Sequence, residues 1–185
     1  ASTETGIIAT HNYNGGVCVA GCLGSVMKNS KLFITPDGII ACSGKTIMSG
    51  YLDDKNLTDQ ILRDGVIYTK DIGKIDENAL LHLIGREDDV INVGGFKVAP
   101  QEVENVAMGH PIVEDCICIA VDSSITGKAL KLLVKTKSGE SLDKRSLATY
   151  IRSQLESYKV PSIYEFVDKI ERTFNGKLNR KFYTS

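Results

Sequence analysis

The sequence has almost no charge excess and no long hydrophobic run, and each shortage excludes a class of protein. Its 22 Lys and Arg residues nearly balance its 23 Asp and Glu residues, giving a formal net charge of −1. Binding to nucleic-acid phosphates needs a clustered excess of basic side chains. No stretch approaches the roughly 18 apolar residues that a membrane-spanning helix requires, and the N-terminus lacks a signal pattern. We therefore expect a cytoplasmic protein with no nucleic-acid partner and no membrane span.

The sequence also lacks the spacings of several common sites. Its cysteines are five, an odd number, and no two follow a Cys-x-x-Cys spacing, which argues against a disulfide framework and a zinc knuckle. No Gly-x-Ser-x-Gly elbow supplies a serine nucleophile, and the three histidines are scattered. Ser43-Gly44-Lys45-Thr46 imitates the end of a phosphate-binding loop, but the upstream glycine is replaced by Ile39, so we expect a turn. The cysteines expected to be buried free thiols are Cys18, Cys22, Cys42, Cys116 and Cys118.

The pattern of the chain changes near residue 87, which predicts two parts and an α+β fold. Residues 1–87 alternate short strand-like runs with glycine and polar turns, so we expect a small β-rich subdomain. One short helix is expected within 52–62, beginning near Asp53 or Asp54. The expected turns are at Gly15-Gly16, 35–38 and 64–65, and the clearest strands are at 31–34 and 66–68.

Residues 88–185 predict a compact lobe in which helices pack on a small mixed sheet. The strand expected at 113–121 places Cys116, Cys118 and Ala120 on one side and three branched residues on the other, which suits burial on both faces. The remaining expected elements are helices at 100–108 and 142–158 and strands at 129–136 and 164–167. The basic cluster at 177–181 is interpreted, on its own, as a mobile tail.

The segment Gly85–Val98, followed by Pro100, combines residue types that few structural needs call for. An arginine suits a planar or multiply hydroxylated ligand, paired glycines allow a close backbone approach or a sharp turn, and proline fits the first turn of a helix. These features indicate a ligand-facing hinge. The alternative is a tight hairpin with a surface Arg-Asp pair.

This segment resembles the linker and first hairpin of the adenylate-forming superfamily, which includes acyl-CoA synthetases, firefly luciferase and the adenylation domains of peptide synthetases. Three further stretches resemble superfamily motifs in the same order: Ser2-Thr3-Glu4, Tyr68-Thr69-Lys70-Asp71 and Arg172–Lys177. The resemblance implies that residues 1–87 are the C-terminal β-rich part of a large AMP-binding domain. It also implies that residues 88–185 are the mobile C-terminal domain.

The resemblance implies a nucleotide site in the first part. Thr3 would hydrogen-bond a phosphate oxygen, and Glu4 would help to hold Mg²⁺, which prefers carboxylate and phosphate oxygens. Asp71 would accept hydrogen bonds from both ribose hydroxyls, as an acceptor-only carboxylate can, and Arg86 would reach the same ribose. Lys70 stands where the family has glycine, and its side chain would crowd or alter the edge of the nucleotide site. The alternative for Asp71 is a turn cap.

The resemblance implies two working faces in the second part. Asp88 would be the pivot of a swinging domain. Gly94, Gly95 and Phe96 would line the channel for the pantetheine arm of coenzyme A. Lys177 would be the catalytic lysine that brings positive charge to the carboxylate and the ATP α-phosphate. The family's proline before this motif is replaced by Glu171.

The expected function is that of an ATP-dependent acyl-CoA ligase, which adenylates a small-molecule carboxylate and passes the acyl group to coenzyme A, with ATP, AMP and Mg²⁺ at the site. The chain begins without methionine and inside a motif, so we expect a downstream piece that is inactive without an upstream N-terminal domain. The alternatives are an amino-acid-activating domain that loads a carrier protein, a non-catalytic nucleotide-binding or interaction module, and a purely structural α+β domain.

Overall fold

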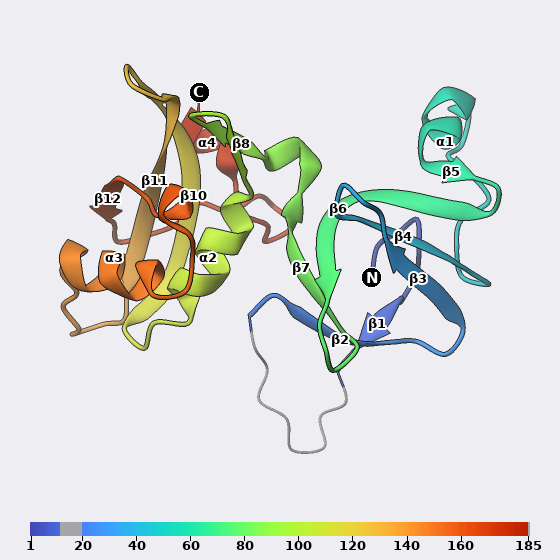
Figure 1. Ribbon diagram of the computed structural model, residues 1–185, viewed down its shortest axis with the longest axis horizontal. Coiled ribbons are helices and arrows are strands. Elements are labelled where there is room, and N and C mark those ends of the chain that lie inside the picture. The colour runs from blue at the N-terminus through green and yellow to red at the C-terminus, as the bar shows by residue number, and fades with distance from the viewer. Residues whose placement is uncertain (12–19, 185) are drawn as a thin grey trace. The chain divides into compact units, whose positions relative to one another are not determined.

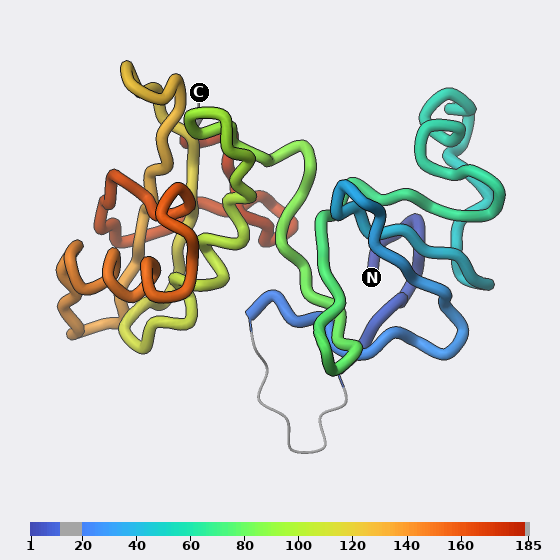
Figure 2. Tube along the Cα trace, viewed as in Figure 1, coloured from blue at the N-terminus to red at the C-terminus, as the bar shows by residue number. Residues whose placement is uncertain are grey.

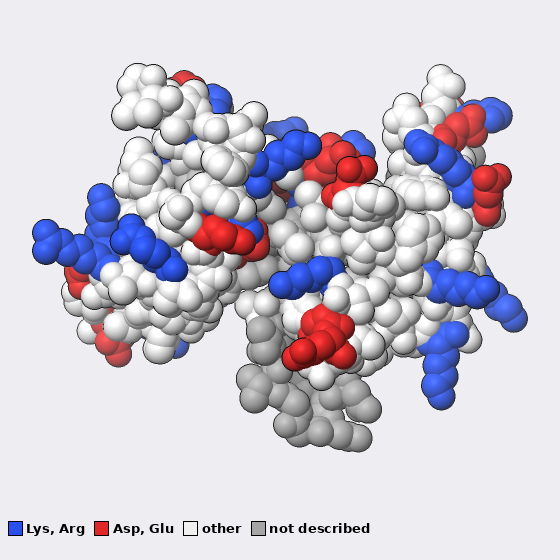
Figure 3. All heavy atoms as spheres, viewed as in Figure 1, with Lys and Arg blue, Asp and Glu red and all other residues white. Residues whose placement is uncertain are grey.

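The computed structural model describes residues 1–11 and 20–184. The chain divides into two compact units, Ala1–Asp88 and Asp89–Ser185, each of which is described below by itself (Figure 1). Both units combine strands with a few helices, so the predicted α+β class is confirmed. No helix among residues 1–11 and 20–184 has the length and apolar character needed to cross a membrane. On the face drawn in Figure 3, acidic and basic side chains are interspersed, as the near-zero net charge suggests.

The first unit is built on an antiparallel sheet. Its elements are β1 (Ala9–Thr10), β2 (Cys22–Val26), β3 (Ser30–Ile34), β4 (Ile39–Gly44), α1 (Lys55–Ile61), β5 (Leu62–Arg63), β6 (Val66–Ile75) and β7 (Leu80–Arg86). The strand order is β1-β2-β7-β6-β4-β3, and β5 pairs with β6. The buried core of this unit consists of Ile8, Ile40, Cys42, Ile67 and Leu81.

Local sequence signals set the connections of this sheet. The turn between β3 and β4 closes through a hydrogen bond from the Gly38 amide to the Thr35 carbonyl at 2.8 Å. Asp64 and Gly65 both have positive φ angles, 49° and 73°, which a tight hairpin between β5 and β6 requires. The Asp54 carboxylate caps α1 by accepting from the Leu57 amide at 2.9 Å. These turns and the short helix confirm the predictions for 35–38, 64–65 and 52–62.

Two further predictions concern the glycine- and cysteine-bearing segments. The stretch 43–46 ends β4 and then turns without opening a helix, as expected for a false phosphate-binding loop. The four cysteines in the described residues, at 22, 42, 116 and 118, are free and buried, as predicted. Burial raises the pKa of the Cys42 thiol and, together with nearby carboxylates, that of Cys116, so both stay protonated and unreactive. Cys18 and the expected turn at Gly15-Gly16 lie outside the described residues.

The second unit follows a short 3₁₀ turn, η1 (Glu87–Asp89). Its elements are β8 (Ile91–Val93), β9 (Phe96–Val98), α2 (Pro100–Met108), β10 (Val113–Ser123), β11 (Gly127–Thr136), α3 (Lys144–Arg152), η2 (Ser157–Lys159), β12 (Ile163–Phe166) and α4 (Arg180–Thr184). β10 and β11 form a long antiparallel hairpin, which can be followed in Figure 2, and β12 adds to β11 in parallel. The small mixed sheet is therefore confirmed. β8 and β9 form a separate two-stranded hairpin.

Side chains alternate across β10 as the sequence predicted. Cys116 and Cys118 belong to the cluster that α2 and α3 cover, whereas Ile117 and Ile119 pack on the opposite face with Ile170. The C-terminal segment covers that second face through partly buried Leu178 and Tyr183. Because both faces are covered, the strand carries apolar residues at consecutive positions.

The helix expected over 142–158 is shorter in the structure and ends at Arg152, so this boundary prediction is wrong. Asp143 caps the N-terminus by accepting from the Arg145 and Ser146 amides at 2.8 and 3.1 Å, which excludes Leu142 from the helix. At the other end, the Ser153 hydroxyl donates to the Tyr150 carbonyl at 2.7 Å and competes with the helical ladder. Leu155 and Tyr158 still pack on the same core, but from a turn and from η2.

Candidate active site

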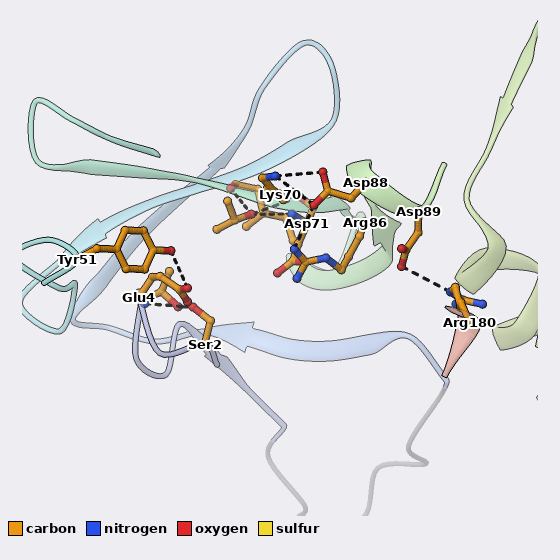
Figure 4. Close-up of polar contacts among 12 residues, drawn as sticks. Ser2, Glu4, Tyr51, Lys70, Asp71, Arg86, Asp88, Asp89 and Arg180 are labelled. Atoms are coloured by element: carbon orange, nitrogen blue, oxygen red, sulfur yellow. Dashed lines mark hydrogen bonds and ion pairs between the residues drawn. The ribbon is translucent and has the colours of Figure 1, made fainter. Parts of the chain in front are cut away.

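A cavity of about 110 Å³ lies in the first unit, where β6 and β7 meet the start of the chain. It brings together three of the predicted site residues, which come from segments far apart in the sequence (Figure 4). The polar side chains around it that matter below are Ser2, Glu4, Tyr51, Lys70, Asp71 and Arg86. Carboxylates and cations therefore line the same small space, an arrangement suited to a ligand with hydroxyl and phosphate groups.

Asp71 and Arg86 lie directly opposite each other on β6 and β7. Arg86 Nη1 is 3.6 Å from Asp71 Oδ1, and the two side chains are about one half and one third exposed, at 48% and 32%. The pairing of β6 with β4 is irregular in the stretch that contains Asp71, between the Ala41–Tyr68 and Ile39–Ile72 pairs. Such bulges re-aim side chains next to binding sites. The structure thus brings the two predicted ribose ligands together.

Two contacts fix Glu4 at the rim of the same cavity. The Tyr51 hydroxyl donates to Glu4 Oε1 at 2.9 Å, and the Glu4 carbonyl accepts from the Met48 amide at 2.8 Å. A hydrogen bond from its own backbone amide, aided by the Ser2 and Tyr51 hydroxyls, lowers the pKa of Glu4 although partial burial opposes the shift. Burial and the Glu4 carboxylate raise the pKa of Tyr51, which keeps its hydroxyl a donor. Glu4 is therefore held as an oriented anion.

Thr3 occupies a different place from that of Glu4. It is exposed in a tight turn that is closed by the Gly6 amide donating to the Ser2 carbonyl at 3.0 Å. Its neighbour Ser2 lines the cavity, and Thr5 is buried with its hydroxyl on the Gly6 carbonyl. The structure therefore places Glu4, Asp71 and Arg86 around one cavity and leaves Thr3 outside its lining.

Lys70, which stands at the family's glycine position, also lines the cavity. Its ammonium group lies 3.1 Å from both carboxylate oxygens of Asp88, and Arg86 Nη2 lies 3.7 Å from Asp88 Oδ2 (Figure 4). Asp88 sits in the middle of η1, at the end of the first compact unit. The extra cation of this chain is thus paired with the carboxylate that the sequence predicts as the pivot.

In the second unit, Gly94 and Gly95 form the turn of the β8–β9 hairpin. Their φ angles of 57° and 93° lie in the region that glycine adopts readily. The Gly95 amide donates to the Asn92 side chain at 2.8 Å, and a Cβ atom at Gly95 would meet nothing within 4 Å. Phe96 is half exposed, at 54%, and its ring stacks on Tyr158 with 4.5 Å between centroids. The turn thus presents bare backbone beside an aromatic pair.

Lys177 lies at the end of an exposed turn in the same unit. Its amide donates to the Thr173 hydroxyl at 3.2 Å, and its carbonyl accepts from the Thr173 amide at 2.8 Å. Gly176, with a φ angle of 77°, completes the turn. The Thr and Gly of the predicted motif therefore shape the loop that carries the lysine. Within the described residues, the Lys177 ammonium has no ion-pair partner.

The basic cluster at 177–181 is not a loose tail. Arg180 opens α4 and forms a two-pronged ion pair with Glu104, with Nη1–Oε1 and Nη2–Oε2 distances of 2.6 and 2.8 Å. Neither this pair nor the Tyr51–Glu4 contact was foreseen from the sequence. Both join residues at least 47 positions apart, and no local pattern signals them.

Glu4 is the residue that the sequence predicts as a Mg²⁺ ligand. Among residues 1–11 and 20–184, no group of three or more His, Cys, Asp or Glu side chains is arranged to hold a metal ion.

Comparisons with known proteins point to the same family. Residues 102–177 match the AMP-binding enzyme C-terminal domain. A long-chain-fatty-acid–CoA ligase of Escherichia coli O6:H1 is 38% identical over 144 residues, which are 78% of this chain and 26% of that protein. A feruloyl-CoA synthase of Amycolatopsis sp is 36% identical over 141 residues, or 76% of this chain and 29% of that protein.

Solved structures agree with the sequence relatives. The apo crystal structure of MatB from Rhodopseudomonas palustris superposes with a TM-score of 0.85 at 28% identity, covering 98% of this chain and 38% of that one. The ATP-bound structure of the same protein gives a TM-score of 0.80 with the same identity and coverage. The chain therefore belongs to the adenylate-forming enzymes and carries their C-terminal domain. It spans 26% of the length of the E. coli ligase.

Proposed function

We propose that this chain is the C-terminal part of an ATP-dependent acid–thiol ligase that activates a carboxylate as an acyl adenylate and transfers the acyl group to coenzyme A. One observation carries the proposal: Glu4, Asp71 and Arg86 surround a single cavity although they come from three separate segments. The similarity to two CoA ligases and to a structure with ATP bound supports it.

The nucleotide fits the cavity by its chemistry. Asp71 is an acceptor that can take both ribose hydroxyls, and Arg86 is a donor beside it at 3.6 Å. The Ser2 hydroxyl and the anionic Glu4 lie on the same rim. Bound Mg²⁺ would neutralise phosphate charge there, and Glu4 is the residue that would hold it.

The first half-reaction needs positive charge where negative charge builds up. A carboxylate oxygen attacks the ATP α-phosphorus, the bond to the bridging oxygen breaks, and pyrophosphate leaves with those electrons. We propose that Lys177 supplies the cation, because its ammonium stands on an exposed, shaped turn. Preorganised charge of this kind is worth a factor of about 10² to 10³ in rate.

The second half-reaction needs a narrow path for a thiol. The thiolate attacks the acyl carbon, the single bond between that carbon and the phosphate oxygen breaks, and AMP leaves with its electrons. We propose that the exposed Gly94-Gly95 turn, with Phe96 beside it, lines this path, since backbone without side chains allows close approach. Lys177 and the Gly94-Gly95 turn belong to the same compact unit, so each half-reaction would use a different face of it, and Asp88 would be the pivot.

The remaining parts of the site are proposed to come from a preceding AMP-binding domain, since the region matched here is about a quarter of the E. coli ligase, 26% of its length. We accordingly expect residues 1–185 alone to form no acyl adenylate. The relatives act on a long-chain fatty acid and on a feruloyl group, so both aliphatic and aromatic carboxylates belong in the substrate panel.

The test is hydroxamate formation from that carboxylate panel with ATP, using the ligase that contains this chain and residues 1–185 alone. We expect turnover by the ligase, with pyrophosphate released, and none by the shorter protein. Lys177→Ala should slow adenylation by about 10²- to 10³-fold. Supplying coenzyme A, a carrier-protein pantetheine or a free amine as acceptor then separates the CoA ligase from a domain that loads a carrier. Absence of any ATP-dependent product would contradict the proposal and favour a non-catalytic module.

A further inference from the structure

The ion pair between Arg180 and Glu104 is the most buried charged contact of the second unit among the residues described. The Glu104 side chain is 6% exposed and that of Arg180 is 21% exposed. Arg180 Nε also lies 3.5 Å from Asp89 Oδ2, on the first residue of this unit (Figure 4). Burial disfavours the guanidinium charge, but hydrogen bonding to Glu104 outweighs it and raises the pKa of Arg180. Arg180 thus joins α4, α2 and the end of η1.

The same pair closes the open edge of β10. Glu104 Oε1 accepts from the Cys118 amide at 2.7 Å, and Arg180 Nη1 donates to the Cys118 carbonyl at 2.9 Å. β10 is the outer strand of its sheet, and outward-facing backbone groups need partners when they are buried. Both charged side chains are therefore hydrogen-bonded to the backbone of Cys118 as well as to each other, so neither can move freely.

Arg180, which this ion pair anchors to α2, lies three positions after Lys177. Leu178 is partly buried under the sheet and pairs with Arg172, and the Asn179 amide donates to the Glu171 carbonyl at 3.0 Å. Residues 178, 179 and 180 are therefore each tied to the body of the unit, whereas 173–177 are exposed. Lys177 is the last exposed residue before the anchored segment.

We infer that Arg180 is a positioning residue for Lys177: its ion pair with Glu104 fixes the base of the lysine loop and ties that base to Asp89, next to the proposed pivot. This inference rests on the proposed function and assigns a role that is specific to the adenylation step. A shift of about 1 Å in a catalytic group can cost about 10²-fold in rate. Other contacts hold the Gly94-Gly95 turn: the pairing of β8 with β9 and the Gly94 amide, which donates to the Thr126 carbonyl at 3.2 Å. Thiolation should therefore not depend on Arg180 in the same way.

The experiment compares the two half-reactions in the ligase that contains this chain. Adenylation is followed by carboxylate-dependent pyrophosphate exchange, and thiolation by CoA-thioester formation from added acyl adenylate. The variants are Arg180→Gln, Arg180→Lys, Glu104→Gln and Lys177→Ala. Arg145→Gln is the matched control, because it removes the same charge from an exposed position in the first turn of α3.

We expect Arg180→Gln and Glu104→Gln to slow adenylation by about 10²-fold while thiolation stays within about twofold, and Arg180→Lys to recover part of the loss. Arg145→Gln should leave both steps unchanged. Equal loss of both steps would mean that Arg180 only keeps the unit folded, and normal adenylation in Arg180→Gln would mean that it has no role; either result overturns the inference. If Lys177→Ala itself adenylates normally, the proposed function fails instead.

Discussion

The ammonium of Lys70 lies 3.1 Å from both carboxylate oxygens of Asp88, so an extra cation of this chain is paired with the residue proposed as the pivot. Arg86 reaches the same carboxylate at 3.7 Å and Asp71 at 3.6 Å. Arg86 therefore connects the other proposed ribose ligand, Asp71, with the proposed pivot, Asp88. A nucleotide that engaged Arg86 and Asp71 would leave Lys70 as the main partner of Asp88.

Replacing Lys70 should loosen η1 without disturbing the sheet. Both partners are about half exposed, at 47% and 52%, and exposed ion pairs are worth up to about 1 kcal/mol, or about fivefold in an equilibrium. In Lys70→Met we expect backbone amides at 87–89 to exchange with deuterium up to about fivefold faster at low salt. The difference should vanish at about 1 M salt, where charges are screened within about 3 Å.

Lys74→Met is the control for this experiment. Lys74 lies on the same strand, is exposed and has no ion pair in the described residues, so its replacement should leave exchange at 87–89 unchanged. Unaltered exchange in Lys70→Met at low salt would show that the pair does not restrain the pivot.

The helices, strands and turns of this fold are largely predictable from the sequence because their signals are local. Asp54 and Asp143 cap helices a few residues away, and the alternation along 113–121 directly reflects two covered faces. Prediction fails where a tertiary contact decides. The helix expected over 142–158 ends at Arg152, where the Ser153 hydroxyl donates to the Tyr150 carbonyl. Leu155 still packs on the core, but from the turn that follows the helix.

The candidate site is foreseen through resemblance rather than through periodicity. Motif spacing identifies Glu4, Asp71 and Arg86, but it says nothing of Tyr51, which orients Glu4 from 47 residues away. It identifies Lys177, but not Glu104, whose carboxylate is buried beside its partner Arg180. Buried charges are held by partners that the chain supplies from a distance, so single-sequence patterns do not reveal them.

Asp71→Asn should weaken nucleotide binding by the proposed ligase that contains this chain. Hydrogen bonds to a charged group are worth about 1.5 to 3 kcal/mol, which corresponds to about 10- to 150-fold in Kd for AMP. Titration calorimetry with AMP measures the change. Asp37→Asn, in the exposed turn after β3, is the control and should bind AMP normally. An unchanged Kd in Asp71→Asn would remove Asp71 from the nucleotide site.

Glu104→Ala should destabilise the chain far more than removal of a surface carboxylate. The substitution leaves a partly buried guanidinium and the Cys118 amide without their carboxylate partner, and breaking a buried ion pair costs about 3 to 5 kcal/mol. Glu114→Ala breaks an exposed pair with Lys135 and should cost less than about 1 kcal/mol. Urea unfolding of residues 1–185 compares the two midpoints. Equal shifts would show that the Glu104–Arg180 pair contributes no more than a surface contact.

Gly95→Ala should slow transfer to the thiol and spare adenylation. A Cβ atom at Gly95 meets nothing within 4 Å in this chain, so it changes only the space offered to an incoming ligand and the strain at a φ angle of 93°.

Gly127→Ala controls for that strain. It adds a Cβ atom into equally open space at a φ angle of 73° in the same unit, at the start of β11. Thioester formation from added acyl adenylate should slow at least about tenfold in Gly95→Ala, which corresponds to a rise of about 1.4 kcal/mol or more in the activation barrier. It should stay normal in Gly127→Ala. Equal losses in the two variants would assign the effect to backbone strain, because obstruction of a thiol path can arise only at the turn that lines it.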